Sequence, residues 1–141
     1  ARRAALAHHV TRTAPMGPWV LINAPCYNDV AKARPYYDAI LPLTGGTIFS
    51  DFMPHGVCHE LRNGGHIWVA PPHNQEVAIP GNRNMVGLLC ECKAEVRAVH
   101  AAALADGGSN EGDPGPRPQY RPNFYGAYAH DMDGSKMSVV S

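Results

Sequence analysis

The chain has 141 residues, with 12 acidic and 12 basic side chains and only 17% charged residues in total. A nucleic-acid partner is disfavoured because phosphate binding needs a basic surface, and the sequence contains no run of Lys or Arg. No apolar stretch approaches the roughly 20 residues that span a bilayer, so a membrane partner is not expected either. The length predicts one domain, or two small repeats that share a core.

The first 17 residues are predicted to form an N-terminal arm, and residues 18–141 a single domain. Residues 1–10 contain two arginines followed by alanines and histidines. Their apolar part is too short and too broken for a signal peptide.

The four cysteines lie at positions 26, 58, 90 and 92. Cys90 and Cys92 are separated by one residue, whereas zinc knuckles and redox pairs have two residues between their cysteines. On a strand both thiols would point to the same face. We therefore expect buried, unreactive thiols, which fits a reduced, cytoplasmic location.

The first half of the domain predicts a strand, a helix and three further strands. Asn28 or Asp29 can cap the helix, and apolar residues three and four positions apart define one buried face. Pro35 should kink the first turns of this helix or move its start later. Asn63-Gly64 is a strong hairpin signal between the last two strands. The four strands are expected at residues 19–23, 47–51, 57–62 and 66–70.

The second half repeats this order after a linker, residues 73–83, that is rich in Pro, Gly and Asn. Residues 85–91 are dense in Val, Leu and Cys and predict a strand. Residues 93–105 predict a helix with one apolar face, and Gly107-Gly108 supplies its C-terminal cap. Three further strands are expected at residues 116–120, 123–130 and 136–140.

The repeated order of elements predicts the architecture. A strand, a helix and three strands occur once in residues 18–72 and again in residues 84–141. Such an internal repeat constrains the arrangement of a chain more firmly than any single element does. We predict an α+β fold in which two βαβββ modules form a curved mixed sheet with a concave ligand cavity.

The C-terminal hairpin is the most informative segment. Residues 124–130 alternate and are rich in aromatic side chains, Asp131-Met132-Asp133-Gly134 is a turn, and a strand follows it. This hairpin resembles the last hairpin of the vicinal-oxygen-chelate superfamily, the fold of glyoxalases, bleomycin-resistance proteins and extradiol dioxygenases. Residues 29–41 and 96–108 are similar to the two helices of that superfamily. The resemblance implies a small organic molecule as ligand and, because family members are often dimers, a homodimer.

The resemblance also implies where a metal would be held. Members of the superfamily use His, Gln and Glu ligands on particular strands, and one divalent ion then polarises substrate oxygens or holds dioxygen. The corresponding positions here are Ile22 or Asn23, Met85 and Ser138. Alkyl, thioether and neutral hydroxyl groups are poor ligands for a hard or borderline divalent ion. We therefore expect no metal and no other cofactor.

The candidate site residues are side chains able to move protons or contact a ligand. His59 is the candidate acid or base in the cavity, since imidazole titrates near neutral pH, and Tyr128 is the second catalytic candidate. Ser138 is expected to face the cavity and to hydrogen-bond a ligand. The remaining candidates for ligand binding, three aromatic or apolar and one cationic, are Met85, Trp68, Tyr120 and Arg117.

Three functions fit these residues. The first is a metal-independent lyase, isomerase or cyclase that uses acid–base chemistry. The second is a non-catalytic protein that sequesters a drug or metabolite in an aromatic cleft. The third is a metal-dependent glyoxalase or dioxygenase whose ligands are displaced to the histidines of the first half, namely His55, His59, His66 and His73.

Overall fold

The structure, a computed structural model, describes residues 22–24 and 29–141. The expected N-terminal arm, Cys26 and most of the strand predicted at residues 19–23 lie outside these described ranges. Of that strand, the structure gives a short segment, β1 (Ile22–Ala24).

The described residues form two helices and eight strands in the predicted order, strand, helix and three strands, repeated once. Helix α1 spans Val30–Ile40 and helix α2 spans Lys93–Ala105, and a short 3-10 turn, η1, spans Pro42–Thr44. The remaining strands are β2 (Thr47–Asp51), β3 (Val57–Glu60), β4 (His66–Val69), β5 (Met85–Leu89), β6 (Ser109–Pro116), β7 (Tyr125–His130) and β8 (Lys136–Val140).

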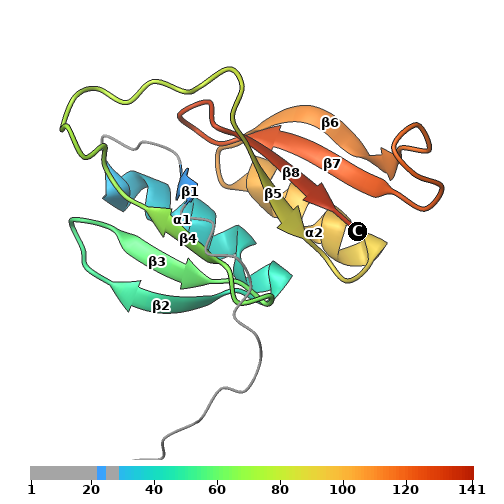
Figure 1. Ribbon diagram of the computed structural model, residues 1–141, viewed down its shortest axis with the longest axis horizontal. Coiled ribbons are helices and arrows are strands. Elements are labelled where there is room, and N and C mark those ends of the chain that lie inside the picture. The colour runs from blue at the N-terminus through green and yellow to red at the C-terminus, as the bar shows by residue number, and fades with distance from the viewer. Residues whose placement is uncertain (1–21, 25–28) are drawn as a thin grey trace, which may run out of the picture.

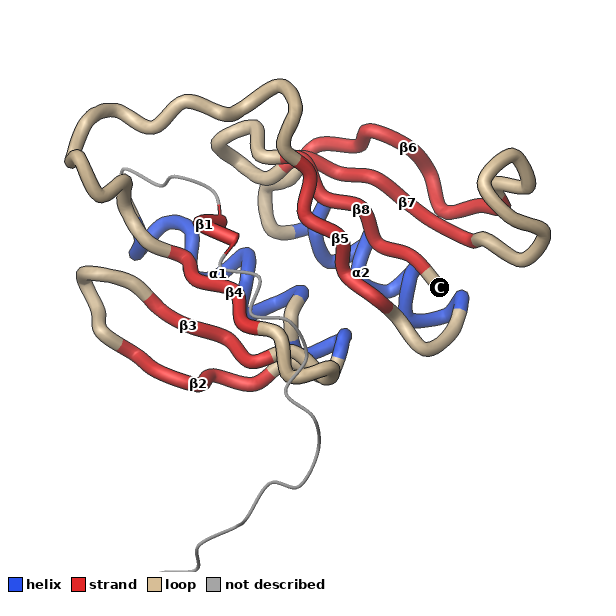
Figure 2. Tube along the Cα trace, in the orientation of Figure 1, coloured by secondary structure: helices blue, strands red, loops and turns tan. Residues whose placement is uncertain are grey.

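The strands form two four-stranded sheets with the same topology. Sheet A has the order β1-β4-β3-β2, and sheet B has the order β5-β8-β7-β6. In each sheet the first and last strands of the module pair in parallel and the other pairs are antiparallel. Both helices lie behind the sheets in Figure 1, and the trace in Figure 2 shows the same two layers. The predicted α+β fold with two βαβββ modules is confirmed.

Apolar faces of the helices and sheets form one core. Helix α1 begins at the cap Asp29, whose carboxylate accepts hydrogen bonds from the backbone N–H groups of Ala31 and Lys32. Helix α2 packs on strands β6, β7 and β8. It also contacts α1, and this contact connects the helices of the two modules. The largest fully buried side chains come from both modules and include Tyr36, Tyr37, Ile40, Leu41, Ile67, Leu88 and Met137.

One buried hydrogen bond connects the modules. The Tyr37 hydroxyl of α1 donates to the Asp131 carboxylate at 2.7 Å, in the turn between β7 and β8. The other oxygen of Asp131 accepts from the backbone N–H groups of Asp133 and Ser135, both at 2.9 Å. Gly134 in this turn has a φ of 85°, a value that glycine adopts readily. The predicted turn is present, and its first residue also holds helix α1 in place.

Two local predictions need correction, and a third is narrowed. Pro35 lies inside α1 and the helix still begins at Val30, which excludes the later start but not the expected kink. The strand expected at residues 116–120 is instead β6 (Ser109–Pro116), an edge strand, where prolines are tolerated because one side makes no ladder bonds. Strand β5 ends at Leu89, and Cys92 is the exposed N-cap of α2, so the two thiols do not share a strand face.

None of the helices in the described ranges is long and apolar enough to cross a membrane.

Candidate functional site

Each sheet has one face against its helix and one face turned away from it, which we call the open face. On β8 and β5, Met137, Val139 and Leu88 are buried in the core. Side chains alternate along a strand, so Ser138 lies on the open face. The register of β8 with β7 places Tyr128 directly beside Ser138, on the same face. The register of β5 with β8 adds Gly87 beside Ser138 and Met85 beside Lys136.

The Tyr128 ring is the centre of this open face of sheet B. The guanidinium carbon of Arg117 lies 5.9 Å from the ring centroid, and the ammonium nitrogen of Lys136 lies 5.6 Å from it. A Cβ on Gly112 of the neighbouring strand β6 would approach the Tyr128 ring to 3.0 Å, so the absence of a side chain there lets the ring lie against β6. The ring is therefore held by its neighbours together with two cations.

The Tyr128 hydroxyl stays protonated at neutral pH. Burial raises the pKa of this phenol above its ordinary value, a hydrogen bond and charge repulsion from Tyr120 raise it further, and Arg117 lowers it. A neutral phenol can donate a hydrogen bond to a ligand, but it cannot serve as a base until it loses its proton.

A histidine–carboxylate pair lies on the same face, next to Tyr128. His130 is opposite Lys136 in the register of β7 and β8, and its Nδ1 is 3.2 Å from Glu111 Oε1 of the β6 strand. The sequence placed His130 at the end of a predicted strand, before the turn, and gave it no role in the site. Its pairing was not predictable because Glu111 lies in the part of β6 that was not expected to be a strand.

A cavity of about 340 Å³ lies at the β5 edge of sheet B. Its lining comes from β5 and the chain after it, from the turn between β3 and β4, and from η1; the residues are Thr44, Leu61, Arg62, Asn63 and residues 87–91. Gly87 belongs both to this lining and to the open face, since a Cβ there would lie 3.5 Å from Ser138 Oγ. The cavity therefore adjoins the open face of sheet B at Gly87.

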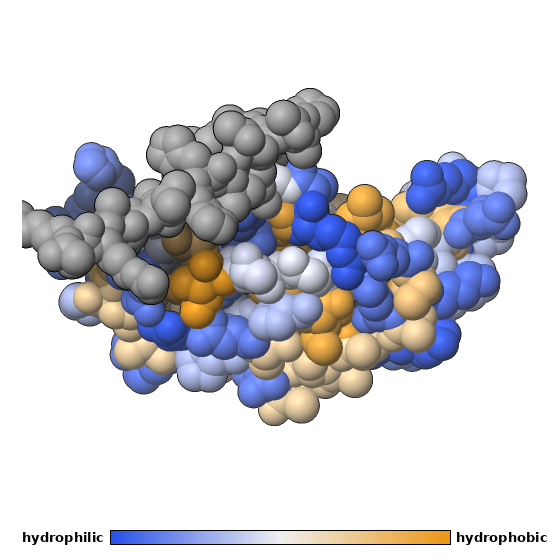
Figure 3. Space-filling view, turned by 90° about the horizontal axis from the view of Figure 1, so that it is seen from below, coloured by the Kyte–Doolittle hydropathy of each residue, from blue (hydrophilic) through white to orange (hydrophobic). Residues whose placement is uncertain are grey.

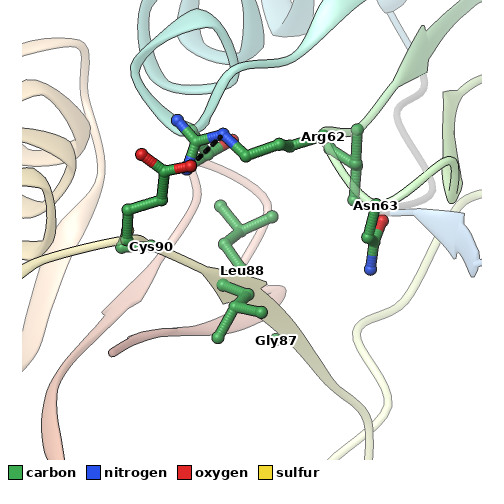
Figure 4. Close-up of a pocket in the computed structure, with 9 residues that line it drawn as sticks. Arg62, Asn63, Gly87, Leu88 and Cys90 are labelled. Atoms are coloured by element: carbon green, nitrogen blue, oxygen red, sulfur yellow. Dashed lines mark ion pairs between the residues drawn. The ribbon is translucent and has the colours of Figure 1, made fainter.

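Ion pairs between the modules form one wall of this cavity. Arg62 donates to both carboxylate oxygens of Glu95 at 3.2 Å, and its Nε lies 3.4 Å from Glu91. Figure 4 shows Arg62 extending from the β3–β4 turn toward the end of β5, with a dashed line for an ion pair among the residues drawn. Hydrogen bonding from Arg62 lowers the pKa of Glu95. Burial raises the pKa of the lining thiol of Cys90 to about 11, which keeps it protonated and unreactive.

The open face of sheet A carries aromatic side chains. Trp68 of β4 stacks with Phe52 at a centroid distance of 6.1 Å and an interplanar angle of 10°. Phe49 meets His66 edge-on at 4.6 Å. The predicted ligand-binding residue Trp68 thus lies on the corresponding open face, but on the other sheet from Tyr128 and Ser138.

His59 lies on the opposite face from the one we expected. Its ring is 1% exposed, between sheet A and helix α1, and its Nε2 is 3.1 Å from Asp38 Oδ1 of that helix. Its register partner on β4 is Ile67, a core residue. Asp38 is also bound by Arg34, which in turn pairs with Asp51 at 2.8 Å. His59 therefore belongs to a chain of polar contacts on the helix side, away from the open face of the sheet.

The remaining candidates gather around Tyr128. Tyr120 is exposed and packs edge-on against Phe124 at a centroid distance of 5.2 Å. Its hydroxyl is hydrogen-bonded to Tyr128 and raises the pKa of that phenol. Arg117 also donates to the backbone carbonyls of Pro116 and Asp113. The structure thus brings together five predicted residues, Tyr128, Ser138, Met85, Tyr120 and Arg117, and it leaves His59 and Trp68 apart from them.

The donor groups at the metal positions of the superfamily do not fit a divalent ion. Met85 and Ser138 lie on the open face of neighbouring strands and offer a thioether and a neutral hydroxyl. Across residues 22–24 and 29–141, no group of three His, Cys, Asp or Glu side chains is arranged to hold a metal. We assign no chemical step to a metal.

Comparison with solved structures identifies the fold. A glyoxalase/bleomycin resistance protein from Albidiferax ferrireducens T118 is 27% identical, with a TM-score of 0.72 over 82% of this chain and 92% of that one. The chain belongs by its fold to the vicinal-oxygen-chelate superfamily. A glyoxalase-related enzyme from Fulvimarina pelagi (16% identity, 82% of each chain, TM-score 0.65) has the same fold. No protein-family model matches the sequence, and no curated protein matches it.

A third structure shows how far sequences diverge on this fold. A glyoxalase/bleomycin resistance protein/dioxygenase family enzyme from Burkholderia phytofirmans PsJN is 15% identical, with a TM-score of 0.61 over 79% of this chain and 89% of that one. The fold is therefore shared by chains that differ at most of their positions. The activity of this vicinal-oxygen-chelate protein therefore depends on its own side chains and not on the fold alone.

Proposed function

We propose that the protein binds a small organic molecule on the open face of sheet B, beside the cavity at the β5 edge. The observation that carries this proposal is the convergence of Tyr128, Ser138 and Gly87 on adjacent strands next to a cavity of about 340 Å³. Pockets of this size and mixed lining are typical of small-molecule sites.

The groups on this face suit a ligand with both polar and apolar parts. Tyr128 and Ser138 can donate hydrogen bonds, whereas the exposed side chains of Met85 and Leu89 offer apolar surface. Gly87 contributes no side chain and leaves room above the strand. A ligand can therefore lie flat across β5, β8 and β7.

The test is ligand-observed NMR with a library of small aromatic and aliphatic molecules. We expect several members to bind the wild type and to lose affinity about fivefold to tenfold in Tyr128→Phe and Ser138→Ala, because each variant removes one hydrogen bond. Tyr125→Phe is the matched control, since Tyr125 lies on the helix side of the same strand and bonds Arg97. Binding that is unchanged in both site variants would place the ligand elsewhere.

Acid–base conversion of the bound molecule is the second candidate function. It is supported by the His130–Glu111 pair at 3.2 Å and by the protonated phenol of Tyr128 on the same strand. A histidine oriented by a carboxylate can take up a proton, and a neutral phenol can donate one. For any substrate found, His130→Gln should abolish turnover and leave binding intact. Absence of turnover in the wild type would favour the sequestering alternative.

The metal-dependent alternative makes a different prediction. A displaced metal site would make any activity sensitive to a chelator and restorable by an added divalent ion. We expect activity to survive the chelator, because the described open face carries no suitable ligand set. Loss of activity with chelator, followed by its recovery with one ion, would reverse this assignment.

We further propose that the protein is a homodimer in the cytoplasm, as the resemblance implies. Exposed apolar side chains on and after β2, Ile48, Phe49 and Phe52, supply surface for a second subunit. On the side of the molecule shown in Figure 3, hydrophobic patches lie among hydrophilic ones. Light scattering of the purified protein should give twice the chain mass. The mass of one chain would contradict the dimer.

A further inference from the structure

We propose that the ligand of sheet B is an amphipathic organic anion, with its carboxylate or similar group at Arg117 and Lys136 and its apolar part across β5. This inference rests on the proposed binding function and names the chemical class of the ligand. It is carried by the charges around the Tyr128 ring and by the order of the strands.

Arg117 and Lys136 are not neutralised by any carboxylate among the described residues. Neither Arg117 nor Lys136 makes an ion pair with any residue that the structure describes. Arg117 is anchored by two backbone carbonyls, which hold the guanidinium without neutralising it and leave N–H donors unused. Two cations within 6 Å of one ring centre therefore keep a positive potential on this face.

Two carboxylates of strand β6 are engaged by other residues. Glu111 Oε1 lies 3.2 Å from His130 Nδ1, and the Asp113 side chain accepts from the Asn110 amide at 2.8 Å. An anion that arrives from solution thus meets no competing ion pair at Arg117 or Lys136 among residues 22–24 and 29–141. A guanidinium and an ammonium are the groups that proteins use to bind carboxylate and phosphate oxygens.

The order of the strands sets the size of the ligand and the position of its apolar end. Neighbouring strands lie about 4.8 Å apart, so β7 and β5 on either side of β8 are separated by about 10 Å. Tyr128 on β7 lies near the cations, Ser138 on β8 offers a hydroxyl midway, and Gly87 on β5 opens onto the cavity. Exposed Leu89 borders that end, and exposed Met85 adds apolar surface beside Lys136. An acid about 10 Å long fits this sequence of charge, hydroxyl and apolar surface.

A similar cation pair on the other face of the same strand provides a control. Lys93 and Arg97 lie 5.5 Å and 5.9 Å from the Tyr125 ring, on the side of sheet B that carries α2. Neither Lys93 nor Arg97 lines the cavity at the β5 edge of sheet B. Its removal changes the net charge of the protein by the same amount as removal of Arg117 and Lys136.

The experiment compares 2-naphthoate with 2-naphthamide, two probes of the same size that differ in charge. Their affinities are measured by titration calorimetry for the wild type, for Arg117→Gln with Lys136→Gln, and for the control Lys93→Gln with Arg97→Gln. We expect naphthoate to bind about tenfold more tightly than naphthamide, which is the effect of one charge-assisted hydrogen bond. This preference should disappear in the Arg117–Lys136 double variant, persist in the Lys93–Arg97 variant, and weaken with added salt.

The outcomes separate the inference from the function on which it rests. Equal binding of the two probes to the wild type overturns the anionic ligand and leaves the proposed binding function standing. A charge preference that also disappears in the Lys93–Arg97 variant reflects net charge alone and overturns the assigned site. Absence of binding by both probes, together with no hit in the NMR library, overturns the binding function itself.

Discussion

The arginines of the first module and the cations of the second module's open face are used in opposite ways. Arg34 pairs with Asp38 and Asp51, and Arg62 pairs with Glu91 and Glu95. Arg117 and Lys136 instead lie against an aromatic ring, without a carboxylate partner among the described residues. The same side-chain chemistry thus holds elements together in one region and leaves charge available in the other.

The contrast shows where to look for function on a fold shared by many proteins. Groups whose hydrogen bonds are satisfied inside the protein, such as Asp131 with Tyr37, contribute to stability. Groups that are held in place but unmatched can serve a ligand. Four substitutions or conditions test this division, from the largest expected effect to the smallest.

Asp131→Ala should destabilise the protein most. The Asp131 side chain is 4% exposed and accepts three hydrogen bonds, from Tyr37 and from two backbone N–H groups. We expect a loss of about 3 kcal/mol in the free energy of unfolding, because the buried Tyr37 hydroxyl and two backbone N–H groups lose their acceptor. Urea titration measures it, with Asp133→Ala as the exposed control expected to cost about 0.5 kcal/mol or less. Equal effects of the two substitutions would contradict a matched internal role for Asp131.

Alkaline pH should destabilise the protein through Cys90, which lines the cavity at the β5 edge of sheet B. Burial raises the folded-state pKa of this thiol to about 11 from an ordinary value of 9.0. Its contribution is therefore complete below pH 9 and is lost as the pH rises toward 11, because the unfolded chain releases the proton first. We expect about 2 kcal/mol of pH-dependent loss that Cys90→Ala abolishes. The exposed Cys92→Ala control should follow the wild-type curve in the same denaturation series.

Gly87→Val should block ligand binding without harming the fold. A Cβ at Gly87 would meet Ser138 Oγ at an ordinary contact distance of 3.5 Å, and β-branched residues favour strands. We expect at least a tenfold loss of affinity, since the larger side chain fills space where the cavity adjoins the open face, with an intermediate effect for Gly87→Ala. Calorimetric titration and thermal unfolding of the same samples measure both properties. Wild-type affinity in the Val variant would move the ligand away from β5.

Arg34→Gln and Arg117→Gln should differ in their effect on Tm, and this difference is the smallest of the four expected effects. Arg34 is one of two groups that lower the pKa of Asp51, after a hydrogen bond from the Met53 backbone. Because the folded-state pKa of Asp51 is lowered, its ionised carboxylate contributes stability that is fully present above the ordinary value of 3.8. This stability is lost as the pH falls through the lower folded-state pKa. Arg34→Gln should therefore lower Tm at neutral pH, and less so in acid. Arg117→Gln should leave Tm unchanged at both pH values.

Much of the fold was predictable because its signals are local. The periodic apolar face of residues 93–105 and the following glycines predicted helix α2 with its observed bounds. The turn at Asp131 and the strand after it were likewise recognisable from turn residues and alternation. These elements identified the superfamily before any tertiary contact was known.

The parts that were mispredicted depend on tertiary neighbours. Glycines and prolines in Ser109–Pro116 indicate turns, yet the segment is a strand because the edge of sheet B accepts residues that a central strand would not. The face of His59 depends on its register against Ile67 and on Asp38 of α1, which sequence spacing does not reveal. The His130–Glu111 pair required the same unrecognised strand.

The Tyr37–Asp131 hydrogen bond has a consequence for how the chain folds. Its partners are 94 residues apart, so this contact closes a loop that spans most of both modules. Closing so long a loop costs chain entropy before the contact returns any energy, which places its formation late and slows folding. The two repeats should therefore unfold as one cooperative unit, and a chain cut within the exposed linker around Val77 and Ile79 should remain associated.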